Sequence, residues 1–340
     1  MSTTVSVNWI EDDEKYALVG LGVKTEGDIP EGELAPGLFV LTKTAFHIPA
    51  HWREWLGSIR ADEVKDCNIF LVSKLRSARP GVLDGENNVL QQCVWNFYVG
   101  LLLTSPFATA HKPALLSGTR RDGEIDIRQQ TDLDSPVPSI WRPYPAIPAD
   151  DFQLAARLAA ALGDIVTAHL TGGHWRLFRT LHIYCNARTT PDILERLHQY
   201  ARCIDGLILP DVGQTRKQFK SRTELFIGPR HHDLMGDIYD IRSADEHLHE
   251  SRYLEGFDRE TRLDLVKKEA ITEYVARTAL ARVIGNSSLW KHFANTPALG
   301  AFWALPAPDR RRIWGDPVDL LEAIADFDPK YIHDGHLGGP

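Results

Sequence analysis

Five prolines crowd a short stretch near the middle of this 340-residue chain, and they constrain the fold more than any other feature. Each proline lacks a backbone N–H and fixes its own φ, so neither a continuous helix nor a central strand can run through them. The stretch therefore predicts a stiff linker over residues 141–149 that separates two domains. A chain of this length can bury a core on each side of it. The prolines are Pro136, Pro138, Pro143, Pro145 and Pro148.

The residues before the linker carry strand signals and one helix signal. Short runs rich in β-branched and aromatic residues are bounded by Gly, Pro or Asp, which predicts strands. The pair Asp122-Gly123 is typical of a hairpin turn, and apolar residues at helical spacing predict a helix over residues 87–103. We therefore expect a mixed α/β domain over residues 1–140. The expected strands cover residues 16–23, 38–42 and 67–73.

The residues after the linker follow a helical pattern. Asp150 and Asp151 can cap a first helix, and Pro191 is placed to open a later one. We expect an all-α bundle over residues 150–304 and a helical tail over residues 305–340, with the aromatic residues of the C-terminal region packed back on the bundle. The chain is then α+β overall. The expected helices cover residues 150–171, 175–187, 191–208, 215–227, 233–251 and 259–284.

Composition and charge exclude several classes of protein. A formal net charge of −8 argues against a protein that coats nucleic acid nonspecifically, although it leaves a local basic surface open. The four cysteines show no C-x-x-C spacing, which indicates reduced thiols. The N-terminus soon becomes acidic, and the most apolar run, residues 99–103, is far too short to cross a membrane. We expect a cytoplasmic protein without a membrane segment.

The segment YDIRSADEHLHESRY, residues 239–253, is unusually polar for a helix and contains both Arg242 and His247. On an ideal helix these two lie about 140° apart, but the arginine stem is long enough to reach towards the imidazole. Imidazole titrates near neutral pH, and guanidinium is a planar partner for phosphate. RNA cleavage without a metal needs such groups, because a base, a phosphate-binding cation and an acid must act together. The alternative is a solvated helix face.

Further motifs occur around this segment in a fixed order. They are RLFRTLHIY at 176–184, ERLH at 195–198, CIDGLI at 203–208, QF…R at 218–222, and YDIRS at 239–243 leading into His247. With these motifs, residues 175–303 resemble an HEPN domain of the Apea-like kind, whose ribonucleases carry an Arg-x(4–6)-His motif. Asp205 stands where the family usually has glutamate, and Leu248 where glycine often follows the histidine. The resemblance implies an all-α HEPN-type helical bundle.

The resemblance also implies a metal-independent endoribonuclease that acts as a toxin or antiviral defence effector. Arg242 would bind the scissile phosphate and His247 would transfer a proton. Ser243 would bond the imidazole or the phosphate, with a plain surface serine as the alternative. Asp205 would orient Arg242 from a neighbouring helix, with a purely structural salt bridge as the alternative. The implied partners are RNA, a second copy of the chain in a homodimer through the helix 233–251, and a regulatory partner or antitoxin; no cofactor is implied.

A basic stretch lies upstream of the motif. Residues 212–232 hold five basic side chains against Glu224 alone, which predicts a face that binds the RNA backbone. A solvated helix face is the alternative, and Arg222 could instead be buried. The histidines of this region match neither His-Glu-x-x-His nor a cysteine-based zinc pattern, so we expect no metal site. The predicted RNA-binding residues are Arg216, Lys217, Lys220 and Arg222.

A non-catalytic HEPN module that binds RNA, a nucleotide or a partner protein is the second hypothesis, with the N-terminal domain as a sensor. The positions of two side chains separate the hypotheses. Arg242 and His247 converging in an open groove would favour catalysis. Burial of either residue in a salt bridge with Asp205 or Glu246 would favour binding alone.

Overall fold

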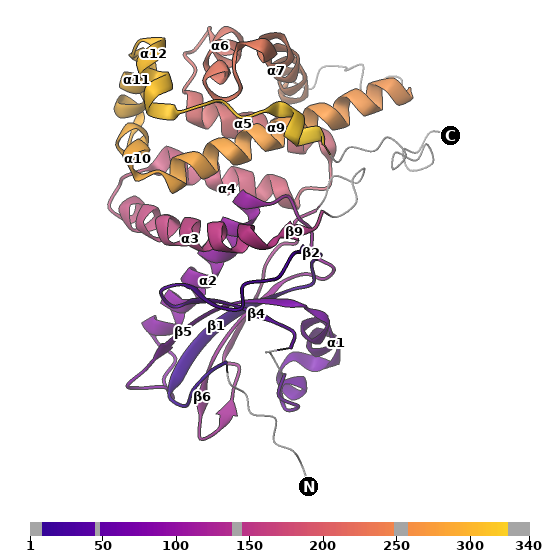
Figure 1. The fold of residues 1–340 in the computed structure, drawn as a ribbon, viewed down its shortest axis with the longest axis vertical. Helices are drawn as coiled ribbons and strands as arrows, with labels where there is room; N and C mark the ends of the chain where they lie inside the picture. The colour runs from indigo at the N-terminus through magenta and orange to yellow at the C-terminus, as the bar shows by residue number, and fades with distance from the viewer. Residues whose placement is uncertain (1–8, 45–47, 138–144, 248–257, 326–340) are drawn as a thin grey trace. The chain divides into compact units, whose positions relative to one another are not determined.

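The computed structural model describes residues 9–44, 48–137, 145–247 and 258–325. The chain is α+β, with a sheet in its N-terminal part and helices in its C-terminal part (Figure 1). It forms two compact units. The first holds the described residues up to Pro136 together with residues 145–163, and the second holds Val137 and the described residues from Asp164 onwards.

An antiparallel seven-stranded sheet forms the first unit, in the order β3-β4-β5-β1-β6-β7, with β8 also paired to β6. Three strands confirm the predicted runs, and the predicted turn joins β6 to β7 with positive φ at Asp122 and Gly123. The strands are β1 (Glu14–Leu21), β3 (Gly32–Ala35), β4 (Leu38–Thr42), β5 (Ile69–Arg76), β6 (Ala114–Arg121), β7 (Glu124–Ile125) and β8 (Gln129–Asp132).

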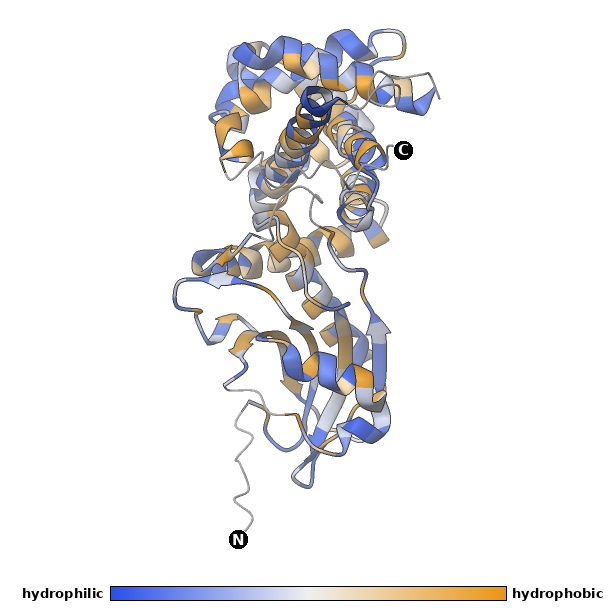
Figure 2. Cartoon of the chain, turned by 90° about the vertical axis from the view of Figure 1, so that its right-hand side faces the viewer, coloured by the Kyte–Doolittle hydropathy of each residue, from blue (hydrophilic) through white to orange (hydrophobic). Residues whose placement is uncertain are grey.

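Helices cover both faces of this sheet. On one face, Tyr16 of β1 stacks against Trp52 of α1 (Trp52–Asp66), and the Trp52 indole donates to the carbonyl of Ile125 at 2.8 Å. On the other face, α2 (Gly85–Thr104) packs across the strands, and the buried ammonium of Lys15 reaches Asp84, the N-cap of α2, at 2.8 Å. Hydrophobic residues run along the central strands between the two helices (Figure 2).

The expected linker is partly built into the first unit. β9 (Ile147–Pro148) pairs in parallel with β2 (Thr25–Glu26). The first turns of α3 (Ala149–Leu170) pack on α2, where Gly100 leaves no room for a side chain beside the backbone of Ala155. Residues 145–163 therefore belong to the first unit, and the boundary lies near Gly163 rather than at residue 150. Residues 141–144 of the expected linker lie outside the described residues.

The second unit is built around α5 (Ile193–Ile208), which is packed against α4 (Trp175–Thr189), α6 (Thr215–Ile227), α7 (His232–Glu246) and α9 (Arg259–Gly285). The apolar residues of α5 lie on one half of the helix, and burial extends beyond that half to the polar residues Arg196 and His198. Gly206 of α5 leaves no room for a side chain because Thr180 of α4 lies against it. The predicted helices are confirmed, except that residues 248–251 of the fifth lie outside the described residues.

The C-terminal helices complete this unit. They are α10 (Ser287–Phe293), α11 (Thr296–Ala304), α12 (Ala307–Trp314) and a 3-10 helix, Leu320–Ile324. The Trp303 indole donates to the carbonyl of Leu207 at 3.0 Å, and Trp314 lies 4.6 Å from Phe226 between ring centroids. The prediction that the aromatic residues pack back on the bundle is thus confirmed. No helix in the described ranges has the length and hydropathy to cross a membrane.

A charged cluster is buried where α4 meets α9. Glu273 accepts hydrogen bonds from the Tyr184 hydroxyl at 2.8 Å and from Nε of Arg277 at 2.9 Å, and it lies 3.6 Å from Arg188. Nearby, Arg196 of α5 lies 2.7 Å from Glu269. Each buried charge costs several kcal/mol unless it is paired. The cluster therefore makes the packing of α4 and α9 depend on Glu273.

Candidate functional site

The predicted motif lies at the C-terminal end of α7. His247 is the C-cap of this helix, and its backbone N–H donates to the carbonyl of Ser243 at 3.2 Å. The side chain of His247 is exposed. Because His247 caps the helix instead of continuing it, the angle of about 140° expected from an ideal helix does not describe its position. The Ser243 hydroxyl makes no hydrogen bond to the described residues.

Two carboxylates hold Arg242. One guanidinium nitrogen of Arg242 lies 3.3 Å from Asp205 of α5. Another lies 2.6 Å from Glu246, which is on α7 like Arg242 itself. The guanidinium carbon lies 5.6 Å from the centroid of the Tyr239 ring. Only 14% of the arginine side chain is exposed. The predicted proximity of Asp205 and Arg242 is therefore confirmed, and Glu246 adds a second ion pair.

The surroundings of Asp205 disfavour the charged form of its carboxyl group. Burial raises the pKa of this carboxyl to about 6, although the nearby guanidinium of Arg242 and, more weakly, those of Arg202 and Arg176 act to lower it. One carboxylate oxygen of Asp205 and Nε of Arg242 are buried without a hydrogen-bond partner among the described residues. The site is thus a polar cluster contributed by α4, α5 and α7 and incompletely satisfied within the described chain.

A second imidazole lies beside the motif. Nδ1 of His198 on α5 is 3.4 Å from the carbonyl oxygen of Arg242 and 3.5 Å from the carboxylate of Asp245. His198 is 8% exposed, so a ribose hydroxyl has little access to it in this arrangement. Sequence reasoning assigned no role to His198, Arg202 or Arg176. The spacing of His198, Arg202 and Asp205, one turn apart on α5, was the signal that they share a face.

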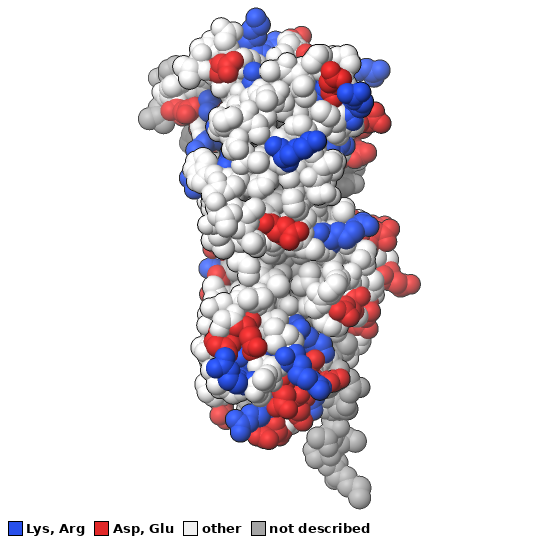
Figure 3. Space-filling model, turned by 90° about the vertical axis from the view of Figure 1, so that its left-hand side faces the viewer, with Lys and Arg blue, Asp and Glu red and all other residues white. Residues whose placement is uncertain are grey.

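Two of the five cations of the basic stretch are paired with acidic residues of α7. Arg216 makes two hydrogen bonds to Asp240 at 2.6 and 2.7 Å, and Lys220 lies 3.1 Å from Asp233. Lys217 is exposed, with no ion-pair partner in the described ranges. On the face of the molecule in Figure 3, basic and acidic side chains are likewise interspersed. The acidic residues of α7 therefore weaken the case for an RNA-binding face on α6.

Arg222 contacts the C-terminal end of α5. Its guanidinium donates to the carbonyl of Ile208 at 2.7 Å and to that of Leu209, at the C-terminal end of α5. It also lies over the ring of Trp303, 5.4 Å from the centroid. A cation at this helix end satisfies carbonyls that lack partners within the helix. We therefore assign Arg222 a structural role in place of the predicted contact with RNA.

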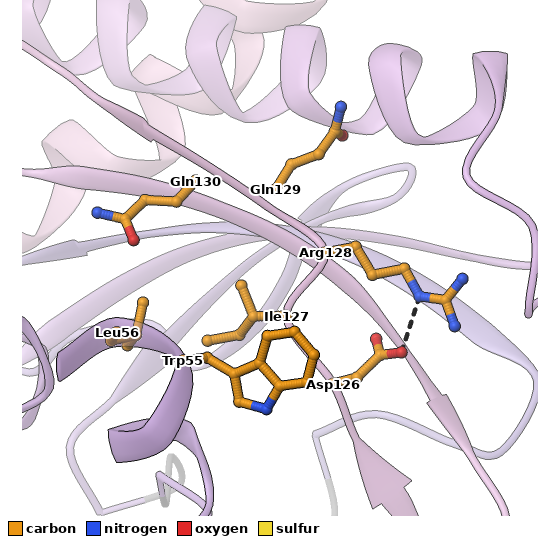
Figure 4. A pocket seen from close by; sticks show the side chains of 7 residues that line it. All are labelled: Trp55, Leu56, Asp126, Ile127, Arg128, Gln129 and Gln130. Atoms are coloured by element: carbon orange, nitrogen blue, oxygen red, sulfur yellow. Dashed lines mark hydrogen bonds and ion pairs between the residues drawn. The ribbon is translucent and has the colours of Figure 1, made fainter.

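The first unit contains a surface pocket of about 490 Å³ between α1 and the segment that leads into β8 (Figure 4). Trp55 and Leu56 form one side, and residues 126–130 form the other. Arg128 donates to one carboxylate oxygen of Asp126 at 2.7 Å, and the other oxygen accepts the N–H of Thr119. The charged groups of the pocket are thus engaged with each other or with the backbone, which leaves it without an evident acid, base or nucleophile.

In the described ranges, no three His, Cys, Asp or Glu side chains lie close enough together to hold a metal ion. Comparison of the chain with protein-family models, curated proteins and solved structures gives no match. The resemblance to HEPN domains consequently rests on the ordered motifs and stays a prediction.

Proposed function

We propose that the second unit is an HEPN-type, metal-independent endoribonuclease in which Arg242 binds the scissile phosphate and His247 transfers a proton. One observation carries most of this proposal. The ion pair between Asp205 and Arg242 fixes the arginine from a neighbouring helix, and an exposed imidazole follows at the end of the same helix. A fixed cation beside an accessible imidazole suits proton-transfer chemistry on a phosphodiester.

The proposed reaction uses the RNA's own 2′-hydroxyl as the nucleophile. A base takes the hydroxyl proton while the 2′-oxygen bonds to phosphorus, and the bond from phosphorus to the 5′-oxygen breaks as an acid protonates that oxygen. The products are a 2′,3′-cyclic phosphate and a 5′-hydroxyl. His247 can serve as base or acid, but one imidazole cannot flank both sides of the phosphate at once.

A two-fold axis supplies the second imidazole most simply. His198 is nearly buried, and His249 lies outside the described residues. We therefore propose a homodimer through the α7 region, which sets Arg242 and His247 of two chains around one groove. Isologous pairing of this kind is the commonest oligomer symmetry. In this proposal the N-terminal unit acts as a sensor.

The two carboxylates on Arg242 differ in how easily a phosphate could replace them. Asp205 is 15% exposed and lies on another helix, so breaking its pair would leave a buried charge uncompensated. Glu246 is 42% exposed and forms a pair between residues one turn apart, which is worth only about 0.3–0.5 kcal/mol. A phosphate can therefore displace Glu246 while Asp205 stays bound.

A non-catalytic module that binds RNA or a protein partner is the second candidate. The specific observation in its favour is the ion pairing of Arg242 with both Asp205 and Glu246, since a neutralised arginine is poorly placed to bind phosphate. Burial of Arg242 in salt bridges favours binding alone. Catalysis requires that the substrate phosphate displace Glu246 from Arg242.

Measuring cleavage and binding in the same variants separates the two candidates. His247→Ala should abolish cleavage of a labelled RNA and leave binding nearly intact, whereas Arg242→Ala should weaken both, because a guanidinium binds phosphate before and during the reaction. His231→Ala, a histidine outside the proposed site, is the matched control and should cleave normally. Equal binding losses in the His247 and Arg242 variants would contradict the assigned roles. Wild-type protein that binds RNA without cutting it would favour the second candidate.

A further inference from the structure

The N-terminal half of α4 carries two arginines on a stretch of the second unit that has no acidic residues in sequence. Between Asp164 and Asp192 the chain has no Asp or Glu, yet it carries Arg176 and Arg179 on the first turns of α4. No carboxylate of the described residues lies within ion-pair distance of either arginine. This differs from α6, where Asp233 and Asp240 neutralise the cations.

Aromatic side chains are interleaved with these arginines. Trp175 is 61% exposed although it is the largest side chain type. One turn later, Phe178 is stacked on His169 with ring centroids 4.1 Å apart and planes 18° from parallel, and His182 meets Phe178 edge-on at 4.5 Å. Residues 175, 178, 179 and 182 follow helical spacing, so they lie on one face of α4.

Arg176, at the edge of this face, connects it to the candidate site. The charge of Arg176 acts on the carboxyl of Asp205, which in turn holds Arg242. Nε of Arg176 is buried without a hydrogen-bond partner among the described residues. The close contact of Thr180 with Gly206 brings the start of α4 to the C-terminal end of α5, where Asp205 lies. A strand of RNA bound at Arg242 would therefore meet α4 next.

We propose that the surface formed by Trp175, Arg176, Phe178, Arg179 and His169, here called the α4 surface, binds single-stranded RNA that enters the site of Arg242; this rests on the proposed function. The exposed indole of Trp175 can stack on an unpaired base of any sequence, and guanidinium groups bind the phosphates beside it. Duplex RNA keeps its bases stacked inside and cannot use the rings. The α4 surface thus selects unpaired RNA.

The test compares binding by wild-type and variant full-length protein. The probe is a fluorescein-labelled single-stranded RNA of about 12 nucleotides, within the usual site sizes, with every 2′-hydroxyl methylated so that it cannot be cleaved. Trp175→Ala should weaken binding by about 5- to 150-fold, the range expected for the loss of one stacked base. Arg179→Gln should make the plot of log affinity against log salt shallower by about 0.7. Both side chains are exposed, and unchanged melting temperatures check the fold.

Two variants with similar exposure serve as controls. Trp55→Ala removes an indole that is 67% exposed in the first unit, and Arg312→Gln removes a guanidinium that is 78% exposed on α12. Both should bind the RNA as the wild type does, and duplex RNA of the same length should bind more weakly than the single strand.

The result separates this inference from the proposed function. Wild-type affinity in the Trp175 and Arg179 variants, a Trp55→Ala loss as large as that of Trp175→Ala, or no binding of RNA at all would overturn the α4 surface. Loss of binding in the α4 variants, together with no cleavage of unmethylated RNA by the wild type, would keep the α4 surface and reject the nuclease.

Discussion

Glu246→Gln tests whether Arg242 is available to RNA. In the structure Glu246 occupies one edge of the Arg242 guanidinium at 2.6 Å, while Asp205 holds another at 3.3 Å. The substitution keeps the size of the side chain and removes its charge. We expect the variant to bind RNA more tightly than the wild type, because the phosphate no longer competes with a carboxylate.

The size of the effect follows from two terms. A pair one turn apart on a helix contributes about 0.3–0.5 kcal/mol, which binding no longer has to overcome. A phosphate on Arg242 would also lie roughly 5 Å from the Glu246 carboxylate, and two such charges in water repel by about 0.8 kcal/mol. Together these give about 1.2 kcal/mol, or about sevenfold in affinity.

Fluorescence anisotropy with a fully 2′-O-methylated single-stranded RNA measures this affinity without cleavage. The matched control is Asp309→Asn, which removes a carboxylate that is 41% exposed and lies 2.8 Å from Arg312 within α12. Its affinity should equal that of the wild type. Unchanged or weaker binding by Glu246→Gln would refute the reasoning, because Glu246 would then help to position Arg242 or the arginine would not contact RNA.

Three further predictions follow from the packing and the site. Glu273→Ala should lower the free energy of unfolding in urea by about 3–5 kcal/mol, because it leaves buried guanidinium groups unpaired; a loss below about 1 kcal/mol would contradict this. Since burial raises the pKa of Asp205 from 3.8 to about 6, its contribution to stability is complete below the unfolded value and is lost as the pH rises through the folded value. Wild-type protein should therefore lose about 3 kcal/mol relative to Asp205→Asn between about pH 4 and pH 6, and parallel stability curves would argue against this pKa. Light scattering should find a dimer, and cleavage per chain should fall on dilution; a monomer with constant activity per chain would leave the two-fold site unsupported.

Periodicity in the sequence was enough to predict most elements of the fold. The central strands and α2 alternate or repeat apolar residues with little interruption, so their patterns were clear. α1 was missed because Gly57 breaks it at a positive φ, and its exposed Trp55 and Ile59 obscure the buried stripe. The domain boundary was misplaced because the pairing of β9 with β2 and the packing of α3 on α2 join segments far apart in sequence.

The ion pair between Asp205 and Arg242 was predictable, but the electrostatics of the basic stretch was not. The family resemblance implied that Asp205 lies beside Arg242, and the structure contains this ion pair. The sequence did not reveal that Asp233 and Asp240 would neutralise Lys220 and Arg216, because these partners meet only when α6 and α7 pack. The absence of acidic residues around α4 was visible in the sequence, but whether its arginines lacked partners depended on tertiary structure.

The most direct test of the central claim is the chemistry of the RNA ends. Purified protein is incubated with total RNA in excess EDTA, beside an Arg242→Ala, His247→Ala double variant, and the new 3′ ends are analysed. Metal-independent cleavage through the 2′-hydroxyl predicts 2′,3′-cyclic phosphate ends with the wild type and no cleavage by the double variant. Activity that disappears in EDTA and returns with a divalent ion, or cleavage that survives in the double variant, would contradict it.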